Sequence, residues 1–161
     1  LGIAEDNSGK LVAEIRRVAQ ELAENEKSDY ILIDGPPGIG CPVIASITGA
    51  THVLAVAEPT LAGEHELERV IALAAHFAVP AALCVNKWDI NSEVADRIEE
   101  RGRASGVEIL PRVRYDRAVT RAQLREQAVV ETEGGAAEDV RRLWQAVAAW
   151  SGAPSPEESS Q

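Results

Sequence analysis

The sequence predicts an α/β fold, a three-layer sandwich around a mostly parallel sheet. Three short apolar runs, Tyr30–Ile33, Val53–Val56 and Ala81–Val85, resemble strands that are buried on both faces. Helical patterns alternate with these runs, and this alternation is typical of right-handed βαβ units. The chain has 161 residues, 45% of them apolar, which suits one globular domain with a real core.

A fourth strand and two long helices fit the same alternation. Val107–Val113 is the fourth apolar run. Apolar residues recur at spacings of four, three and four across Leu11–Leu22, the pattern of an amphipathic helix. A second such stripe, Leu67–Phe77, stops shortly before Pro80.

Two further helices and a tail complete the predicted domain. Val94–Ile98 marks a short helix with Ser92 as its N-cap, and Val140–Ala148 marks the last helix. The sequence therefore predicts one domain over residues 1–150. Residues 151–161 are mostly Ser, Pro, Glu and Gln, so we expect a disordered polar tail.

Composition argues against several classes of function. The net charge of −10 disfavours binding to nucleic acid or to a membrane surface. No apolar run approaches the ~20 residues of a transmembrane helix, and no signal peptide is recognisable. Two cysteines, Cys41 and Cys84, cannot form a disulfide framework, so we expect a cytoplasmic protein. The absence of methionine, even at position 1, predicts that an N-terminal part is missing.

The most informative motif directly follows the first apolar run. Asp34 stands at the end of this predicted strand, and Gly35, Pro36, Pro37 and Gly38 form a rigid loop after it. Ligands of open α/β sheets bind at the carboxyl edge of the strands. A carboxylate there suits Mg²⁺, and a glycine four residues later can offer its backbone N–H to a terminal phosphate.

Three other stretches resemble known nucleotide-binding motifs. The glycines at 35, 38 and 40 reverse the spacing of a dinucleotide fingerprint. Asn7–Lys10 resembles the end of a P-loop, but Ala4 replaces its first glycine and Leu11 its Ser/Thr. Asn86-Lys87-Trp88-Asp89 matches the N-K-x-D pattern that reads guanine in regulatory GTPases. Those GTPases place the switch glycine three residues after the acid, whereas Gly38 is four after Asp34.

Taken together, several segments resemble the MinD/ParA group of ATPases with a deviant P-loop. The closest likeness is the MinD-type branch that carries an inserted ferredoxin domain. The likeness extends over roughly residues 1–150. It is carried by Ile33–Pro42, together with Asn7–Val12, Ala45–Ala50, Glu58–Thr60, Val85–Asp89 and Tyr115-Asp116.

The resemblance implies a P-loop NTPase-like ATPase that binds Mg²⁺ and ATP and forms a homodimer around the nucleotide. Asp34 would hold Mg²⁺ and its water, and Gly38 would sense the γ-phosphate. Asn86 would bind the adenine edge, with the stem of Lys87 stacked over the base.

The loop Arg114-Tyr115-Asp116 would contact the base through its backbone. Related ATPases often close the following segment with a Gly-x-Pro-Val-like run. Residues 126–130 of this chain have a different sequence.

The resemblance also implies parts that this chain does not contain. The P-loop lysine, the first switch acid and the cysteines of the 4Fe-4S clusters would lie upstream of Leu1. A redox or iron–sulfur protein is the implied partner. We therefore expect little hydrolysis from this chain alone, an incomplete core and exposed apolar surface.

Two alternatives remain open. One is a GTPase that reads guanine through Asn86-Lys87-Trp88-Asp89. The other is a non-catalytic scaffold that pairs with a separate subunit carrying the P-loop.

Overall fold

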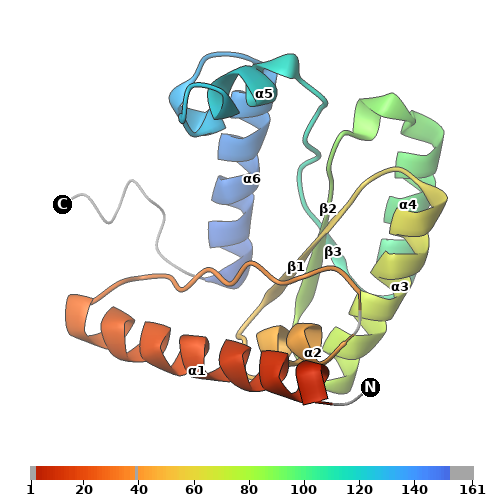
Figure 1. Ribbon diagram of the computed structural model, residues 1–161. Coiled ribbons are helices and arrows are strands. Elements are labelled where there is room, and N and C mark those ends of the chain that lie inside the picture. Colours follow the sequence, from red (N-terminus) through yellow and green to blue (C-terminus); the bar gives the residue numbers. More distant parts are fainter. Residues whose placement is uncertain (1–2, 39, 153–161) are drawn as a thin grey trace.

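The computed structural model describes residues 3–38 and 40–152. Its strands and helices alternate as an α/β fold (Figure 1). In chain order the elements are α1 (Ile3–Glu26), α2 (Cys41–Ile47), β1 (Val53–Ala57), α3 (Leu61–His76), β2 (Ala81–Val85), η1 (Trp88–Ile90), α4 (Ser92–Ala104), β3 (Glu108–Ile109), α5 (Arg117–Gln123), η2 (Val129–Glu131) and α6 (Gly135–Ser151).

The strands form a small parallel sheet with the order β1-β2-β3. Val53 is in register with Ala81, and Leu83 is in register with Ile109. The predicted strands at Val53 and Ala81 and their parallel pairing are therefore confirmed. Figure 1 shows α3 and α4 along one side of the strands and α6 along the other.

The core lies between the sheet and the two helices α3 and α4. Leu67 of α3, Leu83 of β2 and Ile98 of α4 are buried in one apolar cluster. On the other side, Trp144 of α6 contacts the ring of Tyr30, with the ring centroids 4.9 Å apart. These contacts follow from the apolar stripes on the helices, which must be covered by the sheet.

The predicted strand over Tyr30–Ile33 is wrong. These residues have no regular secondary structure, and Leu32 is 76% exposed. A strand persists only when its backbone N–H and C=O groups find a neighbouring strand. Within the described residues β1 pairs only with β2, so Tyr30–Ile33 has no ladder to join.

The predicted strand over Val107–Val113 is shorter than expected. Only Glu108 and Ile109 form β3, followed by an isolated bridge between Val113 and Asn86. Pro111 has no backbone N–H and therefore interrupts the ladder.

One predicted helix cap differs in the structure, and the P-loop-like stretch is helical. Asn91, and not Ser92, caps α4, because its side-chain oxygen accepts the N–H of Val94 at 3.2 Å. The P-loop-like residues 7–10 lie inside α1 and do not form a loop.

The helix predicted over Leu11–Leu22 is present within α1, but its apolar stripe is uncovered. Leu11 is 60% exposed and Ile15 is 58% exposed. Exposed apolar surface is thus found, as expected from the sequence. None of the helices in the described residues combines the length and apolar character needed to cross a bilayer. Most of the predicted tail, residues 153–161, lies outside the described residues.

Candidate functional site

Two of the predicted base-binding segments lie next to each other at one end of the sheet. The turn that starts at Asn86 follows β2, and the Arg114–Asp116 loop follows β3. Asn86 forms a bridge with Val113, and the N–H of Asn86 donates to the carbonyl of Ala57 at 2.8 Å. The fold therefore brings together residues that are almost thirty positions apart because parallel strands end at the same edge.

The side-chain amide of Asn86 is available for a ligand. It is half-buried, and within the described part of the chain no hydrogen bond to it is found. An amide offers both a donor and an acceptor on one plane. Adenine presents the matching pair through N6 and N7.

Lys87 is held in an uncommon backbone conformation beside Asn86. Its φ of 55° lies in the left-handed region, which costs free energy for a residue with a Cβ. Its Nζ lies 2.5 Å from Oε1 of Glu58, at the end of β1. This ion pair links the turns that follow two neighbouring strands, and it directs the lysine across the sheet edge.

Acidic side chains fix the Arg114–Asp116 loop. Asp89 accepts the N–H of Tyr115 at 2.7 Å. Asp139 of α6, only 2% exposed, accepts the N–H of Arg114 at 3.1 Å and binds its guanidinium through both oxygens. The guanidinium of Arg114 and the N–H groups of Arg114 and Tyr115 are therefore engaged in structure. Within the described residues no hydrogen bond is found to the carbonyls of Arg114 and Tyr115, which leaves these acceptors for contact with a ligand.

Asp116 has a capping role at the same place. Its carboxylate accepts the N–H of Ala118 at 2.7 Å at the start of α5, and its other oxygen lies 3.5 Å from the N–H of Ala136 in α6. The hydrogen bond from Ala118 lowers the pKa of Asp116. Asp116 thus anchors two helices and is not free to coordinate a ligand.

The predicted phosphate and magnesium residues are placed apart from this cluster. Asp34, Gly35, Pro36 and Pro37 are exposed. Among the described residues no hydrogen bond or ion pair joins residues 34–38 to Asn86 or to Arg114–Asp116. In Figure 1 the orange segment leads into α2 at the end of the sheet opposite α5. The prediction that residues 34–38 lie beside the other two loops depended on a strand over Tyr30–Ile33, and this strand does not form.

The local geometry of this segment still suits its predicted chemistry. Gly38 has φ +93°, a conformation that side-chain-bearing residues rarely adopt. The Asp34 carboxylate has no partner within the described residues. No group of three His, Cys, Asp or Glu residues able to hold a metal occurs in that part of the chain. Mg²⁺ bound to a nucleotide needs only one or two carboxylates, because phosphates and waters complete its shell.

The two cysteines differ in their chemistry. Cys84 is fully buried in β2, and burial raises the pKa of its thiol to about 12. Cys41 is exposed at the start of α2. Cys84 is therefore an unreactive core residue, as its place in an apolar strand predicts.

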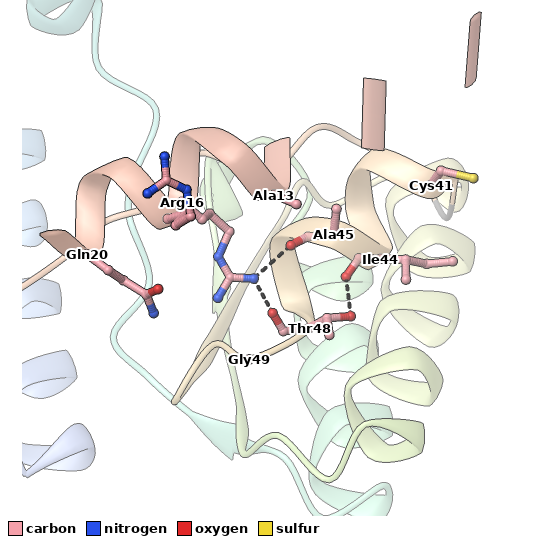
Figure 2. Close-up of a pocket in the computed structure, with 9 residues that line it drawn as sticks. Ala13, Arg16, Gln20, Cys41, Ile44, Ala45, Thr48 and Gly49 are labelled. Atoms are coloured by element: carbon pink, nitrogen blue, oxygen red, sulfur yellow. Dashed lines mark hydrogen bonds between the residues drawn. The ribbon is translucent and has the colours of Figure 1, made fainter. Parts of the chain in front are cut away.

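An open groove of about 490 Å³ lies between α1 and α2 (Figure 2). Arg16 crosses it and donates to the carbonyls of Ala45 at 2.7 Å and of Thr48, which terminates α2. None of the predicted site residues lines this groove. Because the Arg16 guanidinium already donates to backbone carbonyls, we assign the groove a structural role.

Sequence reasoning missed Asp139 as a support of the site. The available signal was its position, since Asp139 stands on the apolar stripe of the last helix, where a carboxylate requires a partner. The partner, Arg114, was named only as part of the base-binding loop.

Comparison with known proteins adds one relative. No family model matches the chain. The uncharacterized protein MJ0578 of Methanocaldococcus jannaschii is 32% identical over 92 residues, which are 57% of this chain and 32% of that protein. The chain thus spans about a third of the length of the curated relative it matches.

Proposed function

We propose that this chain supplies the base-binding and magnesium-binding part of an ATP site of the MinD/ParA type, within a P-loop NTPase-like three-layer α/β sandwich. The observation that carries the proposal is the free, half-buried amide of Asn86 beside the anchored Arg114–Asp116 loop. An asparagine amide supplies the donor and acceptor pair that an adenine edge requires, and the backbone carbonyls of a rigid loop supply further acceptors.

The second support is the Asp34–Gly38 loop. Its free carboxylate and its glycine with positive φ suit a magnesium ligand and a phosphate contact, respectively. When bound with the nucleotide, Mg²⁺ neutralises phosphate charge and polarises the bond that breaks in phosphoryl transfer. Asp34 would hold the ion and its water, and Gly38 would donate its N–H to the terminal phosphate.

The proposed site is incomplete in this chain. Phosphoryl transfer depends on a cradle of backbone N–H groups and a P-loop lysine, and the described residues provide neither. Another part of the same polypeptide or a partner subunit would supply them, and the chain alone would hydrolyse ATP little. Homodimerisation around ATP, coupling to a 4Fe-4S or redox partner and a cytoplasmic location rest on the resemblance alone.

Competition between nucleotides tests this function. We expect the chain to bind ATP in the millimolar range and GTP far more weakly, as followed by NMR titration of the backbone amides of residues 86–89 and 113–116. Asn86→Ala should weaken ATP binding about tenfold, because a bidentate contact to adenine is worth ~1–3 kcal/mol. Asn25→Ala, on the exposed surface of α1, is the matched control and should have no effect.

The GTPase alternative predicts the opposite preference, and GTP binding stronger than ATP binding would favour it. Binding of neither nucleotide would contradict the proposal and favour the scaffold alternative.

A further inference from the structure

Helix α5 and the turn after it carry a concentration of positive charge. Residues 117–125 hold three arginines, Arg117, Arg121 and Arg125, and no acid, which gives a local charge of +3 in a chain of net charge −10. All three arginines are exposed. Within the described part of the chain no hydrogen bond or ion pair is found for any of their guanidinium groups.

The three arginines share one face of the helix. They are spaced four residues apart, and residues at this spacing are neighbours on a helix surface. The N–H of Arg125 donates to the carbonyl of Ala122 at 2.9 Å, so the chain keeps turning beyond the end of α5. Ala122 is buried on the inward face. The arginines therefore form one exposed ridge, which we call the α5 ridge.

Other helices of the chain pair arginine with acid at helical spacing. Arg17 binds Glu14 and Glu21 on α1. Arg103 binds Glu99 on α4. In the α5 ridge the neighbours at this spacing are like charges, which destabilise a helix. The ridge is thus unfavourable for the fold itself, and a structural role does not explain it.

Acids close to α5 in the sequence are already engaged. Asp116, the N-cap of α5, accepts the N–H of Ala118, and its other oxygen lies 3.5 Å from the N–H of Ala136. Glu131 accepts the N–H of Ala128 at 3.1 Å. The acids of α1 lie at the opposite end of the molecule from α5 (Figure 1). The ridge is therefore open to a negatively charged partner.

The surface around the ridge favours a protein as this partner. Leu124, three residues after Arg121, is 82% exposed, and Tyr115, just before the helix, is 49% exposed. Arginine and tyrosine are enriched at protein interfaces, and the leucine adds apolar contact area. A nucleic acid or an anionic membrane carries negative charge over a larger area, so it would also meet the acidic remainder of the chain.

We propose that the α5 ridge is a docking surface for an acidic segment of a partner protein, whose carboxylates pair with Arg117, Arg121 and Arg125. Guanidinium and carboxylate groups suit each other because they can form two parallel hydrogen bonds. The inference does not depend on the proposed function, since the ridge needs no nucleotide.

Binding of an acidic peptide to the full chain tests the proposal. The probe is a short synthetic helical peptide in which glutamate recurs every four residues. The same peptide with glutamine in place of glutamate is its control. We expect only the acidic peptide to shift the backbone amide signals of residues 115–125 in NMR spectra. Added salt should weaken its binding, because exposed charges are screened.

A variant without the ridge should bind the acidic peptide more weakly. The combined substitution Arg117→Gln, Arg121→Gln and Arg125→Gln should reduce the affinity about tenfold, because each exposed ion pair contributes at most a few-fold. Glutamine is nearly as good a helix former as arginine, and the like charges are removed. The thermal midpoint of this variant should therefore be equal to that of the unaltered chain or higher.

A charge-matched variant separates the ridge from the overall charge. It removes three positive charges from exposed positions outside α5 by the changes Lys10→Gln, Lys27→Gln and Arg69→Gln. Its affinity for the acidic peptide should stay close to that of the unaltered chain. Equal weakening in both variants would overturn the inference, because the net charge alone would then explain binding.

Four further results would also overturn it. Absence of binding by the acidic peptide is the first. A lower thermal midpoint of the ridge variant would show that the arginines are structural. Tighter binding of duplex DNA or of phosphatidylglycerol vesicles would assign the ridge to a nucleic acid or a membrane. Self-association of the chain that the ridge variant abolishes, measured by sedimentation, would assign the ridge to a second copy.

Discussion

At the scale of single residues, the candidate site combines free and engaged polar groups. The side chains of Asn86 and Asp34 have no hydrogen-bond or ion-pair partner within the described residues, whereas Asp89, Asp116 and Asp139 each hold the backbone of the Arg114–Asp116 loop or of its helices. The three aspartates maintain the geometry in which the side chains of Asn86 and Asp34 could bind a ligand.

Asp34 gives a prediction on magnesium. Mg²⁺ should strengthen ATP binding to the unaltered chain, and Asp34→Ala should remove this gain of about tenfold, because the variant lacks the carboxylate that would share the ion with the phosphates. Calorimetric titration with ATP, with and without Mg²⁺, measures this gain in affinity. Asp29→Ala lies outside the predicted site and is the control. An equal effect of Mg²⁺ on both variants would count against the role of Asp34.

Glu64 gives a prediction on stability and pH. Its side chain is buried at the junction of α3 and α4, where it binds Arg97 through both oxygens and Arg101 at 2.9 Å. The hydrogen bonds from Arg97 lower the pKa of Glu64. A lowered pKa in the folded state means that the stabilisation is complete above the ordinary pKa and is lost as pH falls through the lowered value.

Glu64→Gln should therefore reduce the free energy of unfolding by about 1–2 kcal/mol at neutral pH. The difference from the unaltered chain should shrink in acid. Urea unfolding across this pH range measures it, with the exposed Glu66→Gln as the matched control. A difference that stays constant with pH would show that the carboxylate charge contributes nothing.

At the scale of elements, the turn between β1 and α3 is tightly constrained. Thr60 caps α3 by accepting the N–H of Gly63 at 3.0 Å. A Cβ on Gly63 would lie 2.4 Å from the carbonyl oxygen of Glu58, the residue that pairs with Lys87. The packing of this turn therefore positions one side of the candidate site.

Gly63→Ala should destabilise the chain by about 1–3 kcal/mol, because backbone atoms must move to admit the methyl group. Gly9→Ala in α1 is the contrasting control. Its Cβ would meet Cys41 at an ordinary 3.5 Å, and alanine favours helix by up to ~1 kcal/mol. Thermal unfolding of both variants measures the effect, and a Gly63→Ala chain as stable as the unaltered one would refute it.

At the scale of the whole molecule, the fold is well packed between the sheet and α3 and α4, but part of its apolar surface is uncovered. Leu83, Ile98 and Leu67 are buried between the sheet and α3 and α4, whereas the stripe of α1 and residues 31–33 expose large apolar side chains. Exposed apolar surface of this extent usually marks an interface.

This surface should bind a hydrophobic dye in the folded chain. The combined substitution of Leu11, Ile15 and Leu22 by Gln should remove most of the dye fluorescence, since these residues are 60%, 58% and 53% exposed. Leu124→Gln, 82% exposed on a remote loop, is the control. A chain that binds no dye and melts cooperatively at high temperature would contradict the expectation of an incomplete core.

Local pattern by itself determined the helices α1, α3, α4 and α6, the strands β1 and β2, their parallel pairing and the core position of Cys84. These features depend on apolar periodicity and on turn residues, which are written in short stretches of sequence. The pattern also placed Asn86 and Arg114–Asp116 at the ends of successive strands, and parallel pairing then brought them together.

Only the tertiary structure decided what depends on partners distant in the sequence. Tyr30–Ile33 has the composition of a strand, yet strand formation requires a neighbouring ladder that the described chain does not provide. For the same reason the Asp34–Gly38 loop is not aligned with the other loops. The pairing of Arg114 with Asp139 and of Tyr115 with Asp89 also became visible only in three dimensions, because a hydrogen bond depends on the distance between its atoms and not on their separation in sequence.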